Sequence, residues 1–194
     1  MIQQLFYGFI LIFFLIACQS GEEVSTDQIL EQETLDSATL SEIGYFKTSF
    51  LSAWKRSEDY TLKLADAMPA ADFQFRPVDS IYTYAEQFTH CMEFSGGQLA
   101  GYLTNGDNPF KDRDFEAMSK VEVMEGLEEM YDYVAKIMED ADAVTLAEPI
   151  NFLGDEIPTW RMFEIINHHN IHHRGQAIIY LRAKGIKPPG FVGW

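Results

Sequence analysis

Apolar side chains recur every three or four residues in four long segments of the chain, which is the spacing of one face of an α-helix. In the first segment Phe46, Phe50 and Trp54 follow one another at intervals of four. No segment shows convincingly the two-residue alternation of a half-buried strand. The predicted helices span residues 41–68, from Asp79 or Ser80 as cap to 103, 120–141, and 160–184.

Proline and glycine residues mark where these helices end. Pro69 follows the first helix, and Gly185, with two prolines soon after it, follows the last. The connections, residues 148–159 among them, are short enough for neighbouring helices to run antiparallel. The sequence therefore predicts an all-α fold, an antiparallel four-helix bundle, that occupies residues 39–194.

The N-terminal end of the chain has a different character. Residues 5–18, LFYGFILIFFLIAC, contain no charged side chain and are too short to span a bilayer comfortably. Their length suits the apolar core of a signal peptide. The ending LIAC resembles a bacterial lipobox, which implies cleavage before Cys18 and lipidation of that residue. We therefore expect a lipoprotein signal peptide at residues 1–17, with a plain signal peptide or an uncleaved anchor as the alternative.

The next segment, residues 18–38, is polar and acidic, and we interpret it as a lipidated, flexible tether. Together with the leader, it predicts a protein of the bacterial cell envelope that is attached to a membrane through its lipid. The chain has two cysteines. If Cys18 is lipidated, Cys91 is the remaining thiol, and no disulfide within the chain is expected.

Composition excludes two classes of protein. Apolar residues make up 47% of the 194 positions, which excludes a disordered chain. The formal net charge is −16, and so acidic a surface repels phosphate backbones. We therefore expect no nucleic-acid partner.

Four of the five histidines lie in the stretch HHNIHHRGQ, residues 168–176. They form two pairs with the i, i+4 spacing that places two side chains on one side of a helix. At 100° per residue, His169 and His173 fall within the apolar sector of the last helix, whereas His168 and His172 fall at its edge. Two neutral imidazoles so placed can hold one divalent ion. Buried histidines that hydrogen-bond to neighbours, or that line a wet groove, are the alternative.

The fifth histidine, His90, has weaker support from periodicity. It lies nearly opposite the strongest apolar ridge of the second helix. Its own side carries Phe94, Gly97 and Gly101, and the two glycines leave room for another helix to approach. Periodicity alone does not decide whether His90 joins the other pair.

Three stretches of sequence carry a resemblance to a known family. They are FRPVDS after the first helix, YAEQFTHCM with His90, and NHHNIHHRGQAIIYLRAKGIKPP near the C-terminus. In this order over about residues 41–190, the chain resembles the DinB-like family of metal-binding four-helix bundles. The resemblance implies a mononuclear site formed by His90, His169 and His173. It also implies a divalent transition metal such as nickel, zinc or iron.

The resemblance further implies a metal-dependent hydrolase that acts on a small-molecule substrate through water activated at the metal. Some relatives instead transfer low-molecular-weight thiols, which is the alternative enzyme function. A non-catalytic envelope protein that binds a metal or small ligand is a third reading, so the sequence leaves open whether the protein is an enzyme. A homodimer is an open alternative for its assembly.

Other polar residues near these histidines have weaker claims. Glu93 is one helical turn after His90 and is a candidate for orienting that imidazole or for moving a proton, with an exposed helix carboxylate as the alternative. Cys91 reads as a small core residue rather than a ligand or nucleophile. Arg174 points away from His169 and is expected at the surface or between helices.

Overall fold

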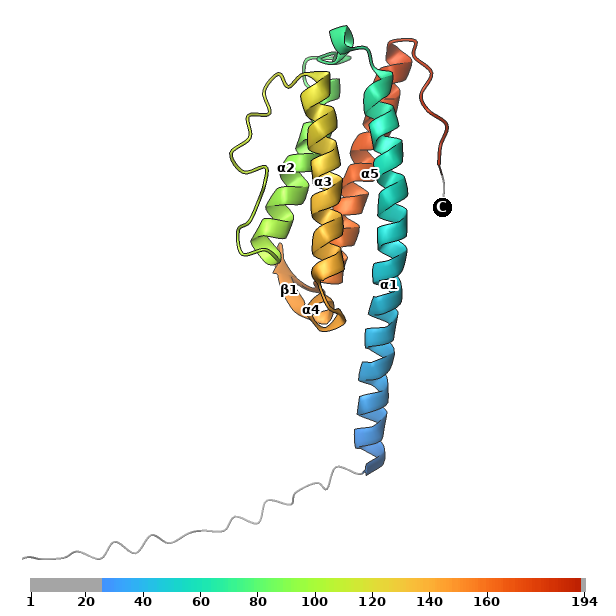
Figure 1. The fold of residues 1–194 in the computed structure, drawn as a ribbon, viewed down its shortest axis with the longest axis vertical. Helices are drawn as coiled ribbons and strands as arrows, with labels where there is room; N and C mark the ends of the chain where they lie inside the picture. Colours follow the sequence, from blue (N-terminus) through green and yellow to red (C-terminus); the bar gives the residue numbers. More distant parts are fainter. Residues whose placement is uncertain (1–25, 193–194) are drawn as a thin grey trace, which may run out of the picture. The chain divides into compact units, whose positions relative to one another are not determined.

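The computed structural model of the protein describes residues 26–192, with side chains from Ser37 onward. Its contacts divide the chain into residues 1–35 and 36–194, and the packing described below belongs to the second unit. The elements are α1 (Thr26–Ala67), the 3₁₀ turn η1 (Ala70–Asp72), α2 (Tyr84–Tyr102), α3 (Lys120–Asp140), α4 (Ala143–Ala147), β1 (Pro149–Phe152), β2 (Asp155–Pro158) and α5 (Trp160–Ala183). The predicted all-α class is confirmed, because α1, α2, α3 and α5 form the bundle in Figure 1.

Two pairs of helices run antiparallel. Between α1 and α3, the ammonium of Lys47 donates to the carbonyl of Glu139, and that of Lys120 donates to the carbonyl of Asp66. In the second pair, the start of α2 lies beside the end of α5, and the end of α2 lies beside the start of α5 (Figure 1). This second pair positions the histidines.

The helices α2 and α3 run parallel, which differs from the expectation of short antiparallel connections. After α2, residues 103–119 return along the outside of the bundle to the start of α3 (Figure 1). The hydroxyl of Tyr133 in α3 donates to the carbonyl of Asp107 at one end of this segment. At the other end, the amide of Gln74 donates to the carbonyl of Met118.

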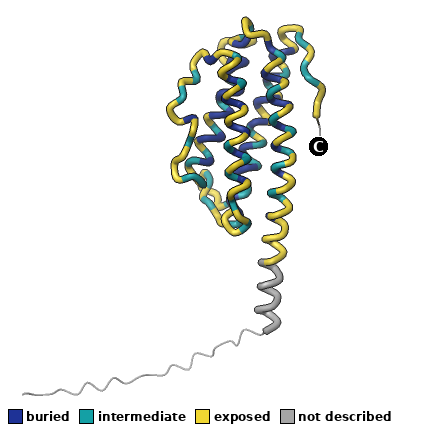
Figure 2. The backbone as a smooth tube through the Cα atoms, viewed as in Figure 1, coloured by how far each residue is buried: buried dark blue, intermediate teal, exposed yellow. Residues whose placement is uncertain are grey.

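The buried positions lie along the four long helices of the bundle (Figure 2), and most of them carry apolar side chains. Phe50 and Trp54 of α1 stack with ring centroids 5.4 Å apart, and Trp54 meets the ring of Tyr131 at 4.5 Å. Phe163 of α5 closes the other side against Phe50. Each fully buried side chain of this size contributes about 1.5–3 kcal/mol to stability. The aromatic side chains of α1 therefore hold this helix in the bundle.

Capping residues fix where α2 begins. The hydroxyl of Thr83 accepts a hydrogen bond from the amide of Glu86, and the Glu86 carboxylate accepts one from the amide of Thr83. This reciprocal capping box requires an acid or amide side chain three residues after the cap, which Asp79 and Ser80 lack. The helix therefore begins later than predicted. At the end of α5, Gly185 has φ of +72°, which confirms the predicted glycine stop.

Close helix packing uses other glycines than expected. A Cβ atom on Gly97 or Gly101 would meet nothing within 4 Å, so neither glycine is needed for a close approach. At Gly96 the added atom would lie 2.3 Å from Oδ1 of Asn108, and at Gly126 it would lie 2.8 Å from Sδ of Met92. These two glycines let the returning segment and α3 pack against α2.

A short hairpin occupies part of the predicted connection between α3 and α5. Strands β1 and β2 pair antiparallel, with Phe152 opposite Asp155. The two turn residues, Leu153 and Gly154, both have positive φ, as a type I′ hairpin turn requires. Four-residue strands carry too little alternation to be recognised in the sequence.

The predicted signal peptide and Cys18 lie outside the described residues. Helix α1 already begins at Thr26, within residues 18–38 and well before the predicted start near Ser41. Within residues 26–192, no helix combines the length and the apolar character needed to cross a bilayer.

Candidate metal centre

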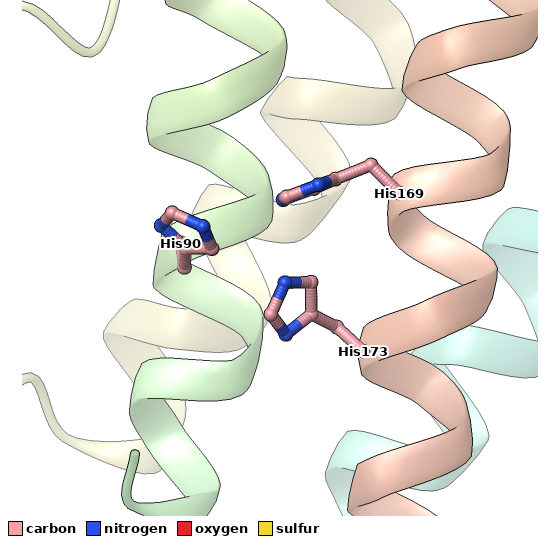
Figure 3. A group of neighbouring side chains, drawn as sticks. All are labelled: His90, His169 and His173. Atoms are coloured by element: carbon pink, nitrogen blue, oxygen red, sulfur yellow. The ribbon is translucent and has the colours of Figure 1, made fainter. Parts of the chain in front are cut away.

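Three histidines from two helices meet at the surface between α2 and α5 (Figure 3). His90 belongs to α2, and His169 and His173 lie one turn apart on α5. One ring nitrogen from each lies within 4.8 Å of the other two. The ring centroids are 5.0 Å apart for either pair with His90 and 4.6 Å apart between His169 and His173.

Burial separates the two interleaved pairs as the helical wheel predicted. His173 is 5% exposed and His169 is half-buried, whereas His168 and His172 are exposed. The i, i+4 spacing of His169 and His173 brings them to the same face of α5. The structure therefore brings together the three histidines named from the sequence and leaves the other two outside the cluster.

His169 fits a metal ligand on two observations. Its ring lies flat against Phe94, which restricts its rotation. Its Nε2 atom is buried and has no hydrogen-bond partner in the described part of the chain. A buried ring nitrogen without a partner costs free energy, and an ion shared with the neighbouring histidines would satisfy it.

The electrostatics of the cluster favour neutral imidazoles. Burial lowers the pKa of His169 to about 4, with the neighbouring His90 and His172 as smaller causes. Burial, and then the charges of His169, His90 and His172, lower the pKa of His173 to about 3. Both rings are therefore neutral at pH 7 and keep the lone pair that a metal ion needs.

His173 has a buried polar partner that the sequence did not single out. Its Nδ1 atom lies 2.7 Å from Oε1 of Gln87, a fully buried residue of α2. Gln87 precedes His90 by three residues, so one face of α2 presents both side chains to α5. That spacing was the available signal, but a glutamine does not register in a hydrophobic pattern.

Glu93 has the position of an exposed helix carboxylate. It lies 3.7 Å from Nδ1 of His90, beyond hydrogen-bond distance, and its side chain is 69% exposed. The ring of Tyr82 packs near that of His90, with ring centroids 5.2 Å apart. Glu93 is therefore near the cluster without being held in it.

An open pocket of about 830 Å³ adjoins the three histidines. Its walls include Arg76, Ile81 and Tyr82 from the segment before α2, with Glu86 from the first turn of α2. The volume lies in the range of pockets that hold small molecules. A ligand in this pocket would reach the histidine nitrogens directly.

Two further residues named from the sequence lie in the core. Cys91 is buried, and burial raises the pKa of its thiol, so it is a core residue as predicted. Arg174 is buried between helices, where its guanidinium donates to the hydroxyls of Ser57 and Thr61 on α1. Of its two expected positions, the interhelical one is correct.

Comparison with known proteins gives matches at the levels of family, sequence and fold. The family model described as the DinB superfamily matches residues 53–177. The uncharacterized protein YrdA of Bacillus subtilis is 39% identical over 49 residues, which are 25% of this chain and 29% of that protein.

Two solved structures have a similar fold. A DinB-like protein from Bacillus cereus has a TM-score of 0.61 at 17% identity and covers 74% of this chain and 95% of its own. The DinB-like protein YjoA of Bacillus subtilis has a TM-score of 0.59 at 18% identity and covers 74% and 96%. At these identities the two structures support the fold alone.

Proposed function

The chain belongs to the DinB superfamily, and on this premise we propose that it holds one divalent transition-metal ion between His90, His169 and His173 and acts as a metal-dependent hydrolase on a small molecule. The observation that carries the proposal is the buried Nε2 of His169, which has no hydrogen-bond partner among the described residues and lies within a cluster of three imidazole rings. Nickel, zinc and iron all accept imidazole ligands, and the donor set does not distinguish them.

The chemistry of the donor set supports a reactive site rather than a closed structural one. Three imidazole ligands leave room in the coordination sphere of a divalent ion. Such an ion supplies Lewis acidity, which lowers the pKa of water and polarises carbonyl groups. The adjoining pocket admits both water and a substrate to the histidine nitrogens.

The protein's own groups would bind and orient the substrate. Tyr82 and Ile81 offer an apolar wall, and Arg76 offers a cation at the same pocket. Glu93 is the nearest candidate for receiving a proton beside His90, although it would have to move closer first.

Turnover of a panel of small esters and amides tests the enzymatic part of the proposal. Hydrolysis should require added zinc, nickel or iron and should disappear in His169→Gln, with the folded state checked by circular dichroism. Turnover only with an added low-molecular-weight thiol would instead identify a thiol transferase. Metal binding without turnover of any substrate in the panel would instead favour a non-catalytic metal-binding protein.

We also propose attachment to a membrane through lipid on Cys18. The support is the sequence of residues 5–18, which combines an uncharged apolar run with the ending LIAC. Incorporation of labelled palmitate into the full chain, absent in Cys18→Ser, is the expected result. Labelling that persists in Cys18→Ser would refute it.

A further inference from the structure

A chain of hydrogen bonds leads from the three-histidine cluster to the segment before α2. Nδ1 of His173 lies 2.7 Å from Oε1 of Gln87, and Nε2 of Gln87 lies 3.0 Å from the hydroxyl of Tyr180. That hydroxyl lies 2.7 Å from the carbonyl oxygen of Tyr82. The chain therefore begins at a ring nitrogen and ends at a backbone carbonyl.

The carbonyl at its end sets the direction of every hydrogen bond. A carbonyl oxygen only accepts, so the hydroxyl proton of Tyr180 must point at Tyr82. The oxygen of Tyr180 then accepts from Gln87, which must turn its NH₂ group toward Tyr180 and its oxygen toward His173. An amide oxygen also only accepts, so Nδ1 of His173 carries the proton.

This direction leaves the other ring nitrogen of His173 as the one with a free lone pair. In Figure 3 that nitrogen, Nε2, points toward His90 and His169. A histidine ligand needs its metal-facing nitrogen unprotonated, and the hydrogen bond made by the opposite nitrogen decides which tautomer is present. The wrong tautomer would place a proton in the middle of the cluster.

We propose that Gln87, held by Tyr180, is a positioning residue that fixes His173 in its Nδ1–H tautomer and turns its Nε2 toward the metal. The proposal rests on the metal centre proposed above. The two side chains behind His173 are suited to this role, because Gln87 is fully buried and Tyr180 is nearly so. The two hydrogen bonds that Gln87 makes, to His173 and to Tyr180, are therefore buried.

The tautomer of His173 in the metal-free protein is the first readout. Long-range ¹H–¹⁵N NMR spectra should show Nδ1–H in the wild type, a mixture in Gln87→Leu, and Nδ1–H again in Gln87→Glu, whose carboxylate also accepts. Tyr180→Phe should give a mixture as well, which covers the case that Gln87→Leu does not fold. Equal tautomer populations in the wild type and both disrupting variants would overturn the proposal.

Zinc affinity, measured by calorimetry, is the second readout. Loss of a hydrogen-bond partner behind a ligand weakens metal binding about 10- to 100-fold, and we expect this in Gln87→Leu but not in Gln87→Glu. Gln176→Leu is the matched control, because Gln176 contacts His172 outside the cluster. An unchanged zinc affinity in Gln87→Leu would overturn the positioning role. An Nδ1–H tautomer that depends on Gln87 in a protein without zinc affinity would instead refute the proposed function alone.

Discussion

The imidazole of His169 lies parallel to the phenyl ring of Phe94, with centroids 3.8 Å apart and planes inclined by 12°. The histidines of the cluster are thus held by different means. A hydrogen bond that His173 donates to Gln87 orients the His173 ring, whereas the ring face of Phe94 orients His169. His90 is half-buried beside Tyr82 and is the least firmly held of the three histidines. This arrangement predicts that the residues behind the ligands control the affinity of the centre.

Replacement of Phe94 by leucine should weaken zinc binding about 2- to 10-fold, because aromatic pairs of this kind contribute about 0.5–1.5 kcal/mol beyond burial. Calorimetric titration with zinc is the measurement. Tyr102→Leu is the matched control, since Tyr102 is another aromatic residue of α2 that contacts Phe152 away from the cluster. An equal loss of affinity in both variants would contradict a specific role for the stack.

Stability of the metal-free protein should fall as the pH falls below about 6.5. His169 and His173 have folded-state pKa values of about 4 and 3, so the unfolded chain binds more protons than the folded one between those values and about 6.5. The contribution of the two neutral rings to the free energy of unfolding is fully present above about pH 6.5. It is lost as the pH falls from there toward the folded-state pKa values. Urea unfolding at several pH values should show a shallower dependence in the His169→Gln, His173→Gln double variant. The same pH dependence in the wild type and the double variant would contradict the burial of His169 and His173 as neutral rings.

Neighbouring glycines of α2 should respond in opposite ways to substitution by alanine. Gly96→Ala would force its new methyl group into Asn108 and Phe110, and we expect a loss of about 1–3 kcal/mol in the free energy of unfolding. Gly97→Ala meets open space and should stabilise by up to about 1 kcal/mol through helix propensity. Urea unfolding of both variants checks the pair. Similar effects of the two substitutions would show that the returning segment does not pack as described.

The buried guanidinium of Arg174 should matter for stability and not for metal binding. Arg174→Ala leaves a cavity and removes the donor that Ser57 and Thr61 share, so we expect a loss of about 2–4 kcal/mol. Arg174→Met keeps most of the side-chain volume and should lose less. Urea unfolding measures the first effect and zinc titration the second. A weakened zinc affinity in a folded Arg174→Met variant would contradict this separation.

The helical wheel identified the inward pair of histidines because α5 presents one face to α2. It gave His90 little support because α2 is buried on two sides, with Met92 toward α3 and His90 toward α5. Hydrophobic periodicity detects only the more apolar of two buried helix faces. The face that carries His90 was identified by the family resemblance. Gln87 was missed because a polar residue that is satisfied inside the bundle has no signature in a hydrophobic pattern.

The parallel orientation of α2 and α3 could also have been predicted from the sequence. Residues 103–119, when extended, can reach about 55 Å, whereas a helix of the length of α3 spans about 30 Å. A connection of that length can return along the whole bundle, so the short-connection argument did not apply there. The capping box at Thr83 was readable too, since Glu86 stands three residues after it.

Metal content tests the three-histidine centre most directly. The protein should be purified without an affinity histidine tag, exposed to zinc, nickel or iron, and analysed for metal after removal of the excess. We predict about one equivalent per chain in the wild type and in the His168→Gln, His172→Gln double variant, and none in the His169→Gln, His173→Gln double variant. Absence of a stoichiometric metal from the wild type, or its retention when His169 and His173 are both replaced, would contradict the centre.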